Sequence, residues 1–395
     1  MAEMKPIGID QTTGQARPVE SSDNLVNDVG QVIELAVTQV YDYSGNLRNN
    51  VQVLFPWSSP QKLTDPASLP TGQVNGAAWS PNGEYLALGH SGAPQISIYQ
   101  RSGTTLTRLA DPATLPVGTG EKPAWSPNGD FLVISHDGSP FITIYQRSGS
   151  TFTKLANPAS LPTNAAIGAD WSPNGELLAV PQFASPYLNI YQRSGTTFTR
   201  LSNPASLPTS TGYTSAWSAN GEFLAVSTDG SPYIFIYQYD GVSFTKLTDP
   251  ASLPTGQGIG AAWSPNGEFL SVAHQNSPFV TIYQRNGTTF TKVANPVTLP
   301  TGRGTTAIWS PNSKFLAIAH QTSPYVSIYQ RNNTIFTKLA DPATLPTGDA
   351  WAGSWSPNGE LLTIGQTPTP FVVNYQTASE MPSSGVVTVI GTTLA

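Results

Sequence analysis

The chain of 395 residues contains no cysteine, only four histidines, and charged residues at 11% of its length. The absence of cysteine excludes disulfides and cysteine-ligated zinc sites. The 18 lysines and arginines stand mostly singly and the net charge is −6, so we expect no nucleic-acid partner. No stretch reaches the roughly 20 apolar residues of a membrane helix, so we expect no membrane insertion. The opening MAEMKPIGIDQTTGQ lacks a signal-peptide core, so we expect no Sec export.

Glycine and proline are abundant, at 35 residues each, and they punctuate a repeat. A Trp-Ser pair opens a near-identical phrase seven times, always 46 residues apart. The tryptophans of these pairs are Trp79, Trp125, Trp171, Trp217, Trp263, Trp309 and Trp355. A second phrase, of the form KLADPATLP, recurs with the same period. The repeat, rather than the total length, therefore decides the predicted fold.

The unit that begins at Gly260 divides into four predicted strands. The strands are GAAWS, EFLSVAH, FVTIYQR and FTKVA, and the turns between them are SPNG, HQNSP and RNGT. Pro265 suits the second position of a tight turn, and Gly267 suits its exit. Four strands in 46 residues predict one blade of a β-propeller. A solenoid of β-hairpins is the competing arrangement, but seven equal units favour a closed ring.

The two ends of the repeat array complement each other. The first KLxDPxxLP phrase, Lys62–Pro70, comes before the first Trp-Ser pair. The last unit, Ser354–Gln376, lacks an outer strand of its own. We therefore predict that Gln61–Thr64 supplies the outer strand of the seventh blade and closes the ring without an open edge.

The predicted fold is all-β: a seven-bladed β-propeller of 46-residue, four-stranded repeats with a flank at each end. We assign residues 1–50 to an N-terminal arm for attachment or oligomerisation, 51–378 to the propeller, and 379–395 to a C-terminal β-prone tail. Before the propeller, strands are expected at Val32–Tyr41 and Arg48–Phe55, on either side of a Ser-Gly turn.

The phrases AWSPNGEYLAL and ISIYQRSG resemble the repeats of WD40-like and TolB-like propellers. Tyr-Gln stands where true WD40 units have Trp-Asp, so their aspartate-centred hydrogen-bond network is not expected. The leader KPIGIDQTTGQARPVESSD is similar to the N-terminal arms of bacteriophage virion proteins. That resemblance implies a tail fibre, head fibre or decoration protein, assembled in the host cytoplasm and displayed on the virion surface.

Comparison of the seven units separates a constant face from a variable face. The SPNG and RSGT turns are nearly constant, whereas the inter-blade loops and the turns between second and third strands vary. One variable position carries Asn75, Glu121, Ile167, Tyr213, Ile259, Thr305 and Trp351. We predict that the variable face binds a ligand or partner, with drift of unconstrained loops as the alternative. Tyr213 and Trp351 are the leading candidates because aromatic rings offer apolar faces, and the charged candidates are Glu121, Lys122, Arg303 and Asp349.

All four histidines occupy one repeat position: His90, His136, His274 and His320. A ring of imidazoles suggests metal binding or pH sensing, so these residues join the candidate face. Carboxylates are missing at matching positions, which favours a polar strand end bonded to the adjacent loop. We expect no metal and no cofactor. Five arginines beside the third-strand turn, such as Arg147, are expected to form a solvated rim, and Pro181 interrupts the pattern at the end of one second strand.

No GxSxG, Walker, HExxH or EF-hand motif occurs, and no glycosidase carboxylate pair stands out. The chain is therefore interpreted as a non-enzymatic protein of the virion exterior. Its expected partners are capsid or tail proteins or a host-surface glycan, and a homo-oligomer is expected, a trimer being one option. The alternatives are a polysaccharide-acting propeller enzyme, by fold analogy alone, and an intracellular protein-interaction scaffold.

Overall fold

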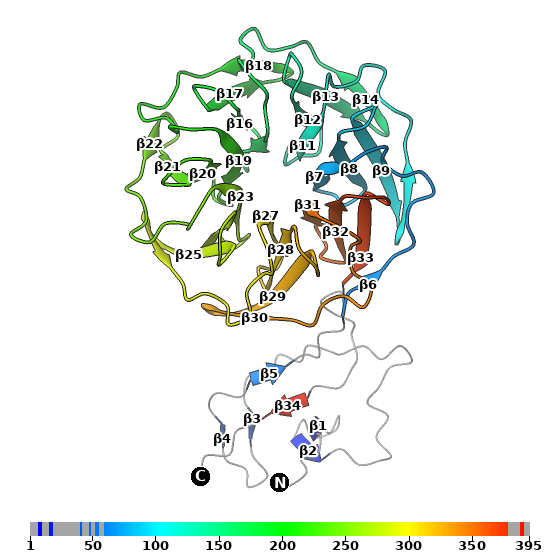
Figure 1. Cartoon of the computed structure of the whole chain (residues 1–395), viewed down its shortest axis with the longest axis vertical. Coiled ribbons are helices and arrows are strands. Elements are labelled where there is room, and N and C mark those ends of the chain that lie inside the picture. The colour runs from blue at the N-terminus through cyan, green and yellow to red at the C-terminus, as the bar shows by residue number, and fades with distance from the viewer. Residues whose placement is uncertain are drawn as a thin grey trace. The chain divides into compact units, whose positions relative to one another are not determined.

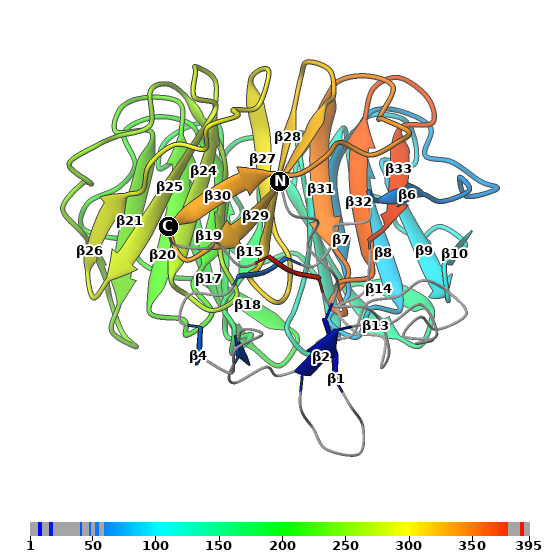
Figure 2. The same cartoon turned by 90° about the horizontal axis from the view of Figure 1, so that it is seen from below.

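The computed structural model describes residues 59–377 without a gap, together with six short strands outside that range. Residues 59–377 form one compact unit, and residues 1–58 with 378–395 form a second. In the larger unit, seven four-stranded antiparallel sheets stand around a common centre (Figure 1). Seen edge-on, the strands run between the two faces of the ring (Figure 2). The prediction of an all-β, seven-bladed propeller is confirmed.

Each blade begins at the centre of the ring, and its strands follow one another outward. The innermost strands are β7 (Val74–Trp79), β11 (Gly120–Trp125), β15 (Asp170–Trp171), β19 (Gly212–Trp217), β23 (Gly258–Trp263), β27 (Gly304–Trp309) and β31 (Ala350–Trp355). The second strands are β8 (Tyr85–His90), β12 (Phe131–His136), β16 (Leu177–Pro181), β20 (Phe223–Thr228), β24 (Phe269–His274), β28 (Phe315–His320) and β32 (Leu361–Gln366).

The two outer positions of each blade are as regular. The third strands are β9 (Ile96–Ser102), β13 (Ile142–Ser148), β17 (Leu188–Ser194), β21 (Ile234–Tyr239), β25 (Val280–Asn286), β29 (Val326–Asn332) and β33 (Val372–Gln376). The outermost strands are β10 (Thr105–Arg108), β14 (Thr151–Lys154), β18 (Thr197–Arg200), β22 (Phe244–Lys246), β26 (Thr289–Lys292), β30 (Ile335–Lys338) and β6 (Gln61–Lys62).

The seventh blade closes the ring as predicted. Its outermost strand, β6, precedes the first blade in the chain and pairs antiparallel with β33, with Lys62 opposite Tyr375. The N–H of Leu63 continues the ladder by donating to the carbonyl of Asn374 (2.8 Å). Hydrogen bonds therefore join the two ends of the repeat array, and the last blade has its full set of strands.

The described residues of the smaller unit form three two-stranded ribbons. They are β1 (Ile7–Ile9) with β2 (Ala16–Pro18), β3 (Val40–Tyr41) with β4 (Leu47–Arg48), and β5 (Gln52–Leu54) with β34 (Thr388–Ile390). The predicted Ser-Gly turn falls in the sequence between β3 and β4, at residues that lie outside the described ones. The remaining parts of the predicted strands Val32–Tyr41 and Arg48–Phe55, apart from β5, lie outside the described residues.

The phrase WSPNGE closes each turn between first and second strands with its own side chains. In the fifth blade, Ser264 Oγ accepts from the N–H of Phe269 (2.9 Å) and donates to Asn266 Oδ1 (2.6 Å). The same Asn266 oxygen accepts from the N–H of Glu268 (3.2 Å). Gly267 has φ +71°, a conformation that costs glycine little. The phrase repeats because each turn uses the same serine, asparagine and small-residue geometry.

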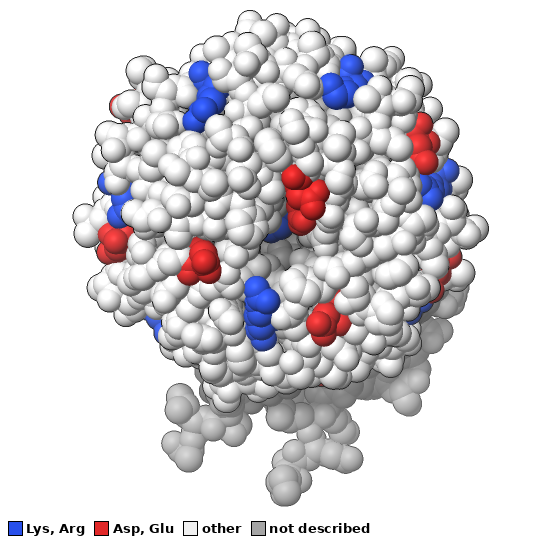
Figure 3. All heavy atoms as spheres, turned by 45° about the horizontal axis from the view of Figure 1, so that its top comes forward, with Lys and Arg blue, Asp and Glu red and all other residues white. Residues whose placement is uncertain are grey.

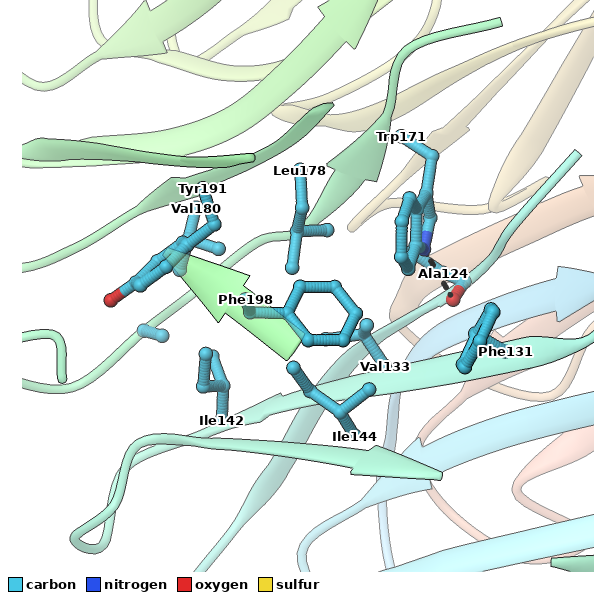
Figure 4. Packing of buried hydrophobic residues seen from close by; sticks show 11 residues of the cluster. Ala124, Phe131, Val133, Ile142, Ile144, Trp171, Leu178, Val180, Tyr191 and Phe198 are labelled. Atoms are coloured by element: carbon cyan, nitrogen blue, oxygen red, sulfur yellow. Dashed lines mark hydrogen bonds between the residues drawn. The ribbon is translucent and has the colours of Figure 1, made fainter. Parts of the chain in front are cut away.

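The hydrophobic core lies largely between neighbouring blades. One cluster joins Ala124, Phe131, Val133, Ile142 and Ile144 of the second blade to Trp171, Leu178, Val180, Tyr191 and Phe198 of the third (Figure 4). Trp171 Nε1 donates to the Ala124 carbonyl (3.3 Å), which ties the two blades together. Because a blade buries its apolar face only against the next blade, the ring folds as one unit.

The expected solvated rim of arginines is wrong. Arg147 Nε donates to the carbonyl of Gly129 (2.7 Å), and its guanidinium lies 5.4 Å from the ring centroid of Tyr85 in the preceding blade. Arg193, Arg285 and Arg331 repeat this arrangement over Phe131, Phe223 and Phe269. Hydrogen bonds and cation–π contacts hold these side chains against the turns, so the arginines of the constant face stabilise the blades.

Candidate functional site

The variable face gathers the turns between second and third strands and the loops between blades. Hydrogen bonds join the two kinds of segment, as where Gln275 N–H donates to the carbonyl of Gln257 (3.0 Å). The variable position was expected in the inter-blade loop, but in six blades it lies at a β-bulge of the innermost strand. A bulge re-aims the side chain of its extra residue, so Tyr213 and Trp351 project from the inner wall of the ring rather than from flexible loops.

A polar and aromatic network crosses this face from the fourth to the seventh blade. Gln257 Nε2 donates to Tyr213 OH (2.6 Å) and to Asp229 Oδ1 (2.6 Å). Arg303 Nη2 donates to Gln257 Oε1 (3.3 Å), and the Arg303 guanidinium lies 5.9 Å from the ring centroid of Trp351. We call these five residues the face network. The structure thus brings together Tyr213, Arg303 and Trp351 and adds two residues that the sequence analysis missed.

The face network is anchored but accessible. Tyr213, Gln257, Arg303 and Trp351 are half-buried, and Asp229 is exposed. Burial, and then the negative charge of Asp229, raise the pKa of the Tyr213 phenol, which keeps it neutral at physiological pH. Trp351 Nε1 and Arg303 Nε are buried donors with no acceptor among residues 59–377. Asp349 is half-buried at the repeat position of Gln257 and Arg303, and its carbonyl accepts from the Thr367 N–H (3.0 Å).

Glu121 and Lys122 sit together on β11, apart from the face network. Lys122 Nζ donates to Thr214 Oγ1, which in turn donates to the Ile259 carbonyl (2.9 Å). Burial lowers the pKa of Lys122 to about 8 and raises the pKa of Glu121 to about 7. Figure 3 shows a hollow at the centre of the ring, with basic atoms inside it and separate acidic and basic side chains around it. Lys122 thus links the second blade to Thr214 of the fourth blade, the residue that follows Tyr213 in the chain.

The third blade departs from the repeat. Its innermost strand, β15, has two residues where the other six have six each. Pro181 accounts for the difference: in five other blades the residue at the matching position pairs with the innermost strand, and proline has no N–H to donate to such a ladder. In the segment before β15, Ala166 forms an isolated antiparallel β-bridge with Gln182. Asp170, within β15, accepts from the Trp217 N–H (2.8 Å), and burial raises its pKa to about 7.

The four histidines lie beneath the face. His90, His136, His274 and His320 have no exposed surface. Each Nε2 contacts a hydroxyl of the adjacent third strand, for example Ser97 Oγ at 2.9 Å from His90. His136 Nδ1 also contacts the Gly138 carbonyl of the adjacent turn (2.7 Å). Burial lowers the pKa of His90, His274 and His320 to about 4 and lowers that of His136. Among the described residues, no cluster of three potential metal ligands occurs.

Comparisons with known proteins identify the fold. A chain from the crystal structure of the mitotic checkpoint complex aligns with a TM-score of 0.61 at 17% identity, covering 83% of this chain and 99% of its own length. The β-propeller domain of Cps50 (Swd1) from Myceliophteria thermophila aligns with a TM-score of 0.60 at 13% identity, covering 80% and 99%. No protein-family model matches the chain, and no curated protein matches it. These likenesses, at 13–17% identity, agree with the seven-bladed β-propeller fold described above.

None of the described segments is a helix long and apolar enough to cross a membrane.

Proposed function

We propose that the chain is a non-enzymatic recognition protein on the exterior of a bacteriophage particle, as a tail fibre, head fibre or decoration protein. In this proposal the N-terminal arm attaches it to the capsid or tail. The variable face binds a host-surface glycan or a neighbouring virion protein. The face network is the observation that carries the recognition role.

The face network supports recognition because it is rigid and accessible at once. Its side chains come from four consecutive blades, so the scaffold sets their spacing. Half-buried aromatic and arginine side chains are the types that dominate binding sites. Two structures with a similar fold are a chain of the mitotic checkpoint complex and the Swd1 propeller domain. The checkpoint chain is by its description part of a protein assembly, which supports a binding role for the present chain.

The virion setting is supported by the leader alone. Its similarity to the arms of bacteriophage virion proteins covers about 25 residues before the propeller, which itself closes through β6 and needs no arm. An appended arm on a complete domain suits attachment to a larger particle.

Immunogold labelling of purified particles with an antibody against the propeller tests the proposal. Label on the tail would support host recognition, and label over the capsid would support a head fibre or decoration protein. Absence of label from every particle would contradict the virion proposal and favour the scaffold or enzyme alternatives.

A further inference from the structure

We propose that the variable face binds a sugar that carries a carboxylate, with Arg303 receiving the carboxylate and Trp351 packing against the sugar ring. This inference rests on the proposed recognition function and names the chemical class of its ligand.

Arg303 is a guanidinium without a carboxylate partner. Elsewhere in the propeller, Arg101 pairs with Glu360, and Lys246 pairs with Asp249 at 2.5 Å. Within residues 59–377, Arg303 forms no ion pair, and its one side-chain acceptor is the neutral amide oxygen of Gln257. Its Nε is buried without an acceptor. Because Gln257 accepts from Nη2 alone, the donors left on Nη1 and Nη2 match the two oxygens of a carboxylate, and an arriving carboxylate would supply the missing partner.

Arg303 is also held in place before any ligand arrives. The Trp351 indole lies beneath it, and Gln257 is itself fixed by Tyr213 and Asp229. Little side-chain freedom is therefore left to lose on binding, which favours affinity. The half-buried Trp351 adds an apolar ring surface beside the cation, and the C–H face of a sugar ring packs on such a surface.

The acidic residues nearby favour a sugar over an acidic peptide. Asp229 is exposed at one end of the face network, and Asp349 lies one blade beyond Arg303. A peptide rich in acidic side chains would meet these carboxylates and be repelled. A sugar acid brings one carboxylate for Arg303 and several hydroxyl groups that can donate to Asp229 or accept from the Gln257 amide.

The test compares two probes that differ only in the carboxylate: methyl glucuronoside and methyl glucoside, titrated into the full chain and followed by saturation-transfer NMR. We expect the glucuronoside to bind about tenfold more tightly or better. Arg303→Gln should remove that preference and leave weak binding of both probes, and Trp351→Ala should weaken both. Arg303→Lys keeps the charge without the paired donors and should retain only part of the preference.

Lys154→Gln is the matched control, because it removes one positive charge from the outermost strand β14, where Lys154 donates to Asn157 Oδ1 (2.6 Å). It should leave both affinities unchanged, and melting curves identify any variant that fails to fold. Equal binding of the two probes, no binding of either, or a preference that survives Arg303→Gln would overturn the inference. Displacement of the glucuronoside by acetate at equal concentration would also overturn it, because a bare carboxylate would then suffice. None of these outcomes bears on particle labelling, so the proposed function fails or stands separately.

Discussion

At the scale of single residues, buried ionisable side chains determine how the propeller responds to pH. The histidines and the acidic residues act in opposite directions. A buried histidine resists protonation, so the folded state binds fewer protons than the unfolded chain below about pH 6.5. A buried carboxylic acid resists ionisation, so the folded state binds more protons above about pH 4.

His274 should make the propeller less stable in acid. Its pKa is about 4 in the folded state, so its contribution is present above about pH 6.5 and is lost as the pH falls through about 4. His274→Gln, which copies Gln182 and Gln366 of other blades, cannot take up that proton. When the pH is lowered from 7.5 to 4.5, the free energy of unfolding of the variant should rise by about 1–3 kcal/mol relative to that of wild type. Melting temperatures at the two pH values measure the change, and a constant difference between the proteins would refute the assignment.

Asp170 should have the opposite effect. Its pKa is about 7 when folded, so its contribution is present below about pH 4 and is lost as the pH rises through 7. Asp170→Asn keeps an oxygen acceptor for the Trp217 N–H and cannot ionise. When the pH is raised from 5 to 8, the free energy of unfolding of the variant should rise by about 1–3 kcal/mol relative to that of wild type. Denaturant unfolding at both pH values tests this, and a loss at pH 8 would show that the charge itself is needed.

At the scale of single elements, the strands and tight turns could be predicted because their signals are local. Alternating apolar residues mark the third strands, and the proline, asparagine and glycine of SPNG mark the turns. The sequence predicts a loop at the position of Tyr213 and Trp351, whereas the structure has a β-bulge there. A bulge is a property of two paired strands, so the sequence of one strand does not contain it. The prediction of a solvated arginine rim fails for a similar reason, because the carbonyl acceptors of these arginines lie in another turn and the rings that they face lie in the preceding blade.

Replacing Pro181 should restore the regular innermost strand of the third blade. Ser135 and Ser227 occupy the repeat position of Pro181 in two other blades. Pro181→Ser therefore introduces a residue that the repeat already uses there, and it returns the missing N–H donor. We expect slower amide hydrogen exchange at residues 167–169 and a gain of about 1 kcal/mol in stability. Exchange followed by mass spectrometry reports on the segment directly. Unchanged exchange there would mean that another feature, such as Gly168, keeps the strand apart.

At the scale of the whole molecule, ring closure could be predicted because it depends on counting phrases at the two ends. The face network could not. It depends on where four blades place their side chains, and Gln257 and Asp229 look like ordinary loop residues in the sequence. One signal was available: Gln257 and Arg303 share a repeat position, so they had to lie on adjacent blades.

Two truncations, one ending before β6 and one ending after it, should distinguish the role of the arm from that of ring closure. Removing residues 1–50 should leave the melting temperature of the propeller unchanged and abolish incorporation into particles. Removing residues 1–63 also removes β6 and the Leu63 hydrogen bond, and should lower the melting temperature by about 5 °C or more. Equal melting of the two truncations would show that closure through β6 adds no stability. Incorporation without residues 1–50 would refute the attachment role of the arm.

The central claim is that recognition resides on the variable face. The most direct measurement is binding of the labelled full chain to purified particles and to the cells they infect, for wild type and for Tyr213→Ala/Trp351→Ala. The account predicts that the double variant keeps its melting temperature within about 2 °C and loses binding by about tenfold or more. Unchanged binding by a folded double variant would contradict it, and the variation around this face would then be drift.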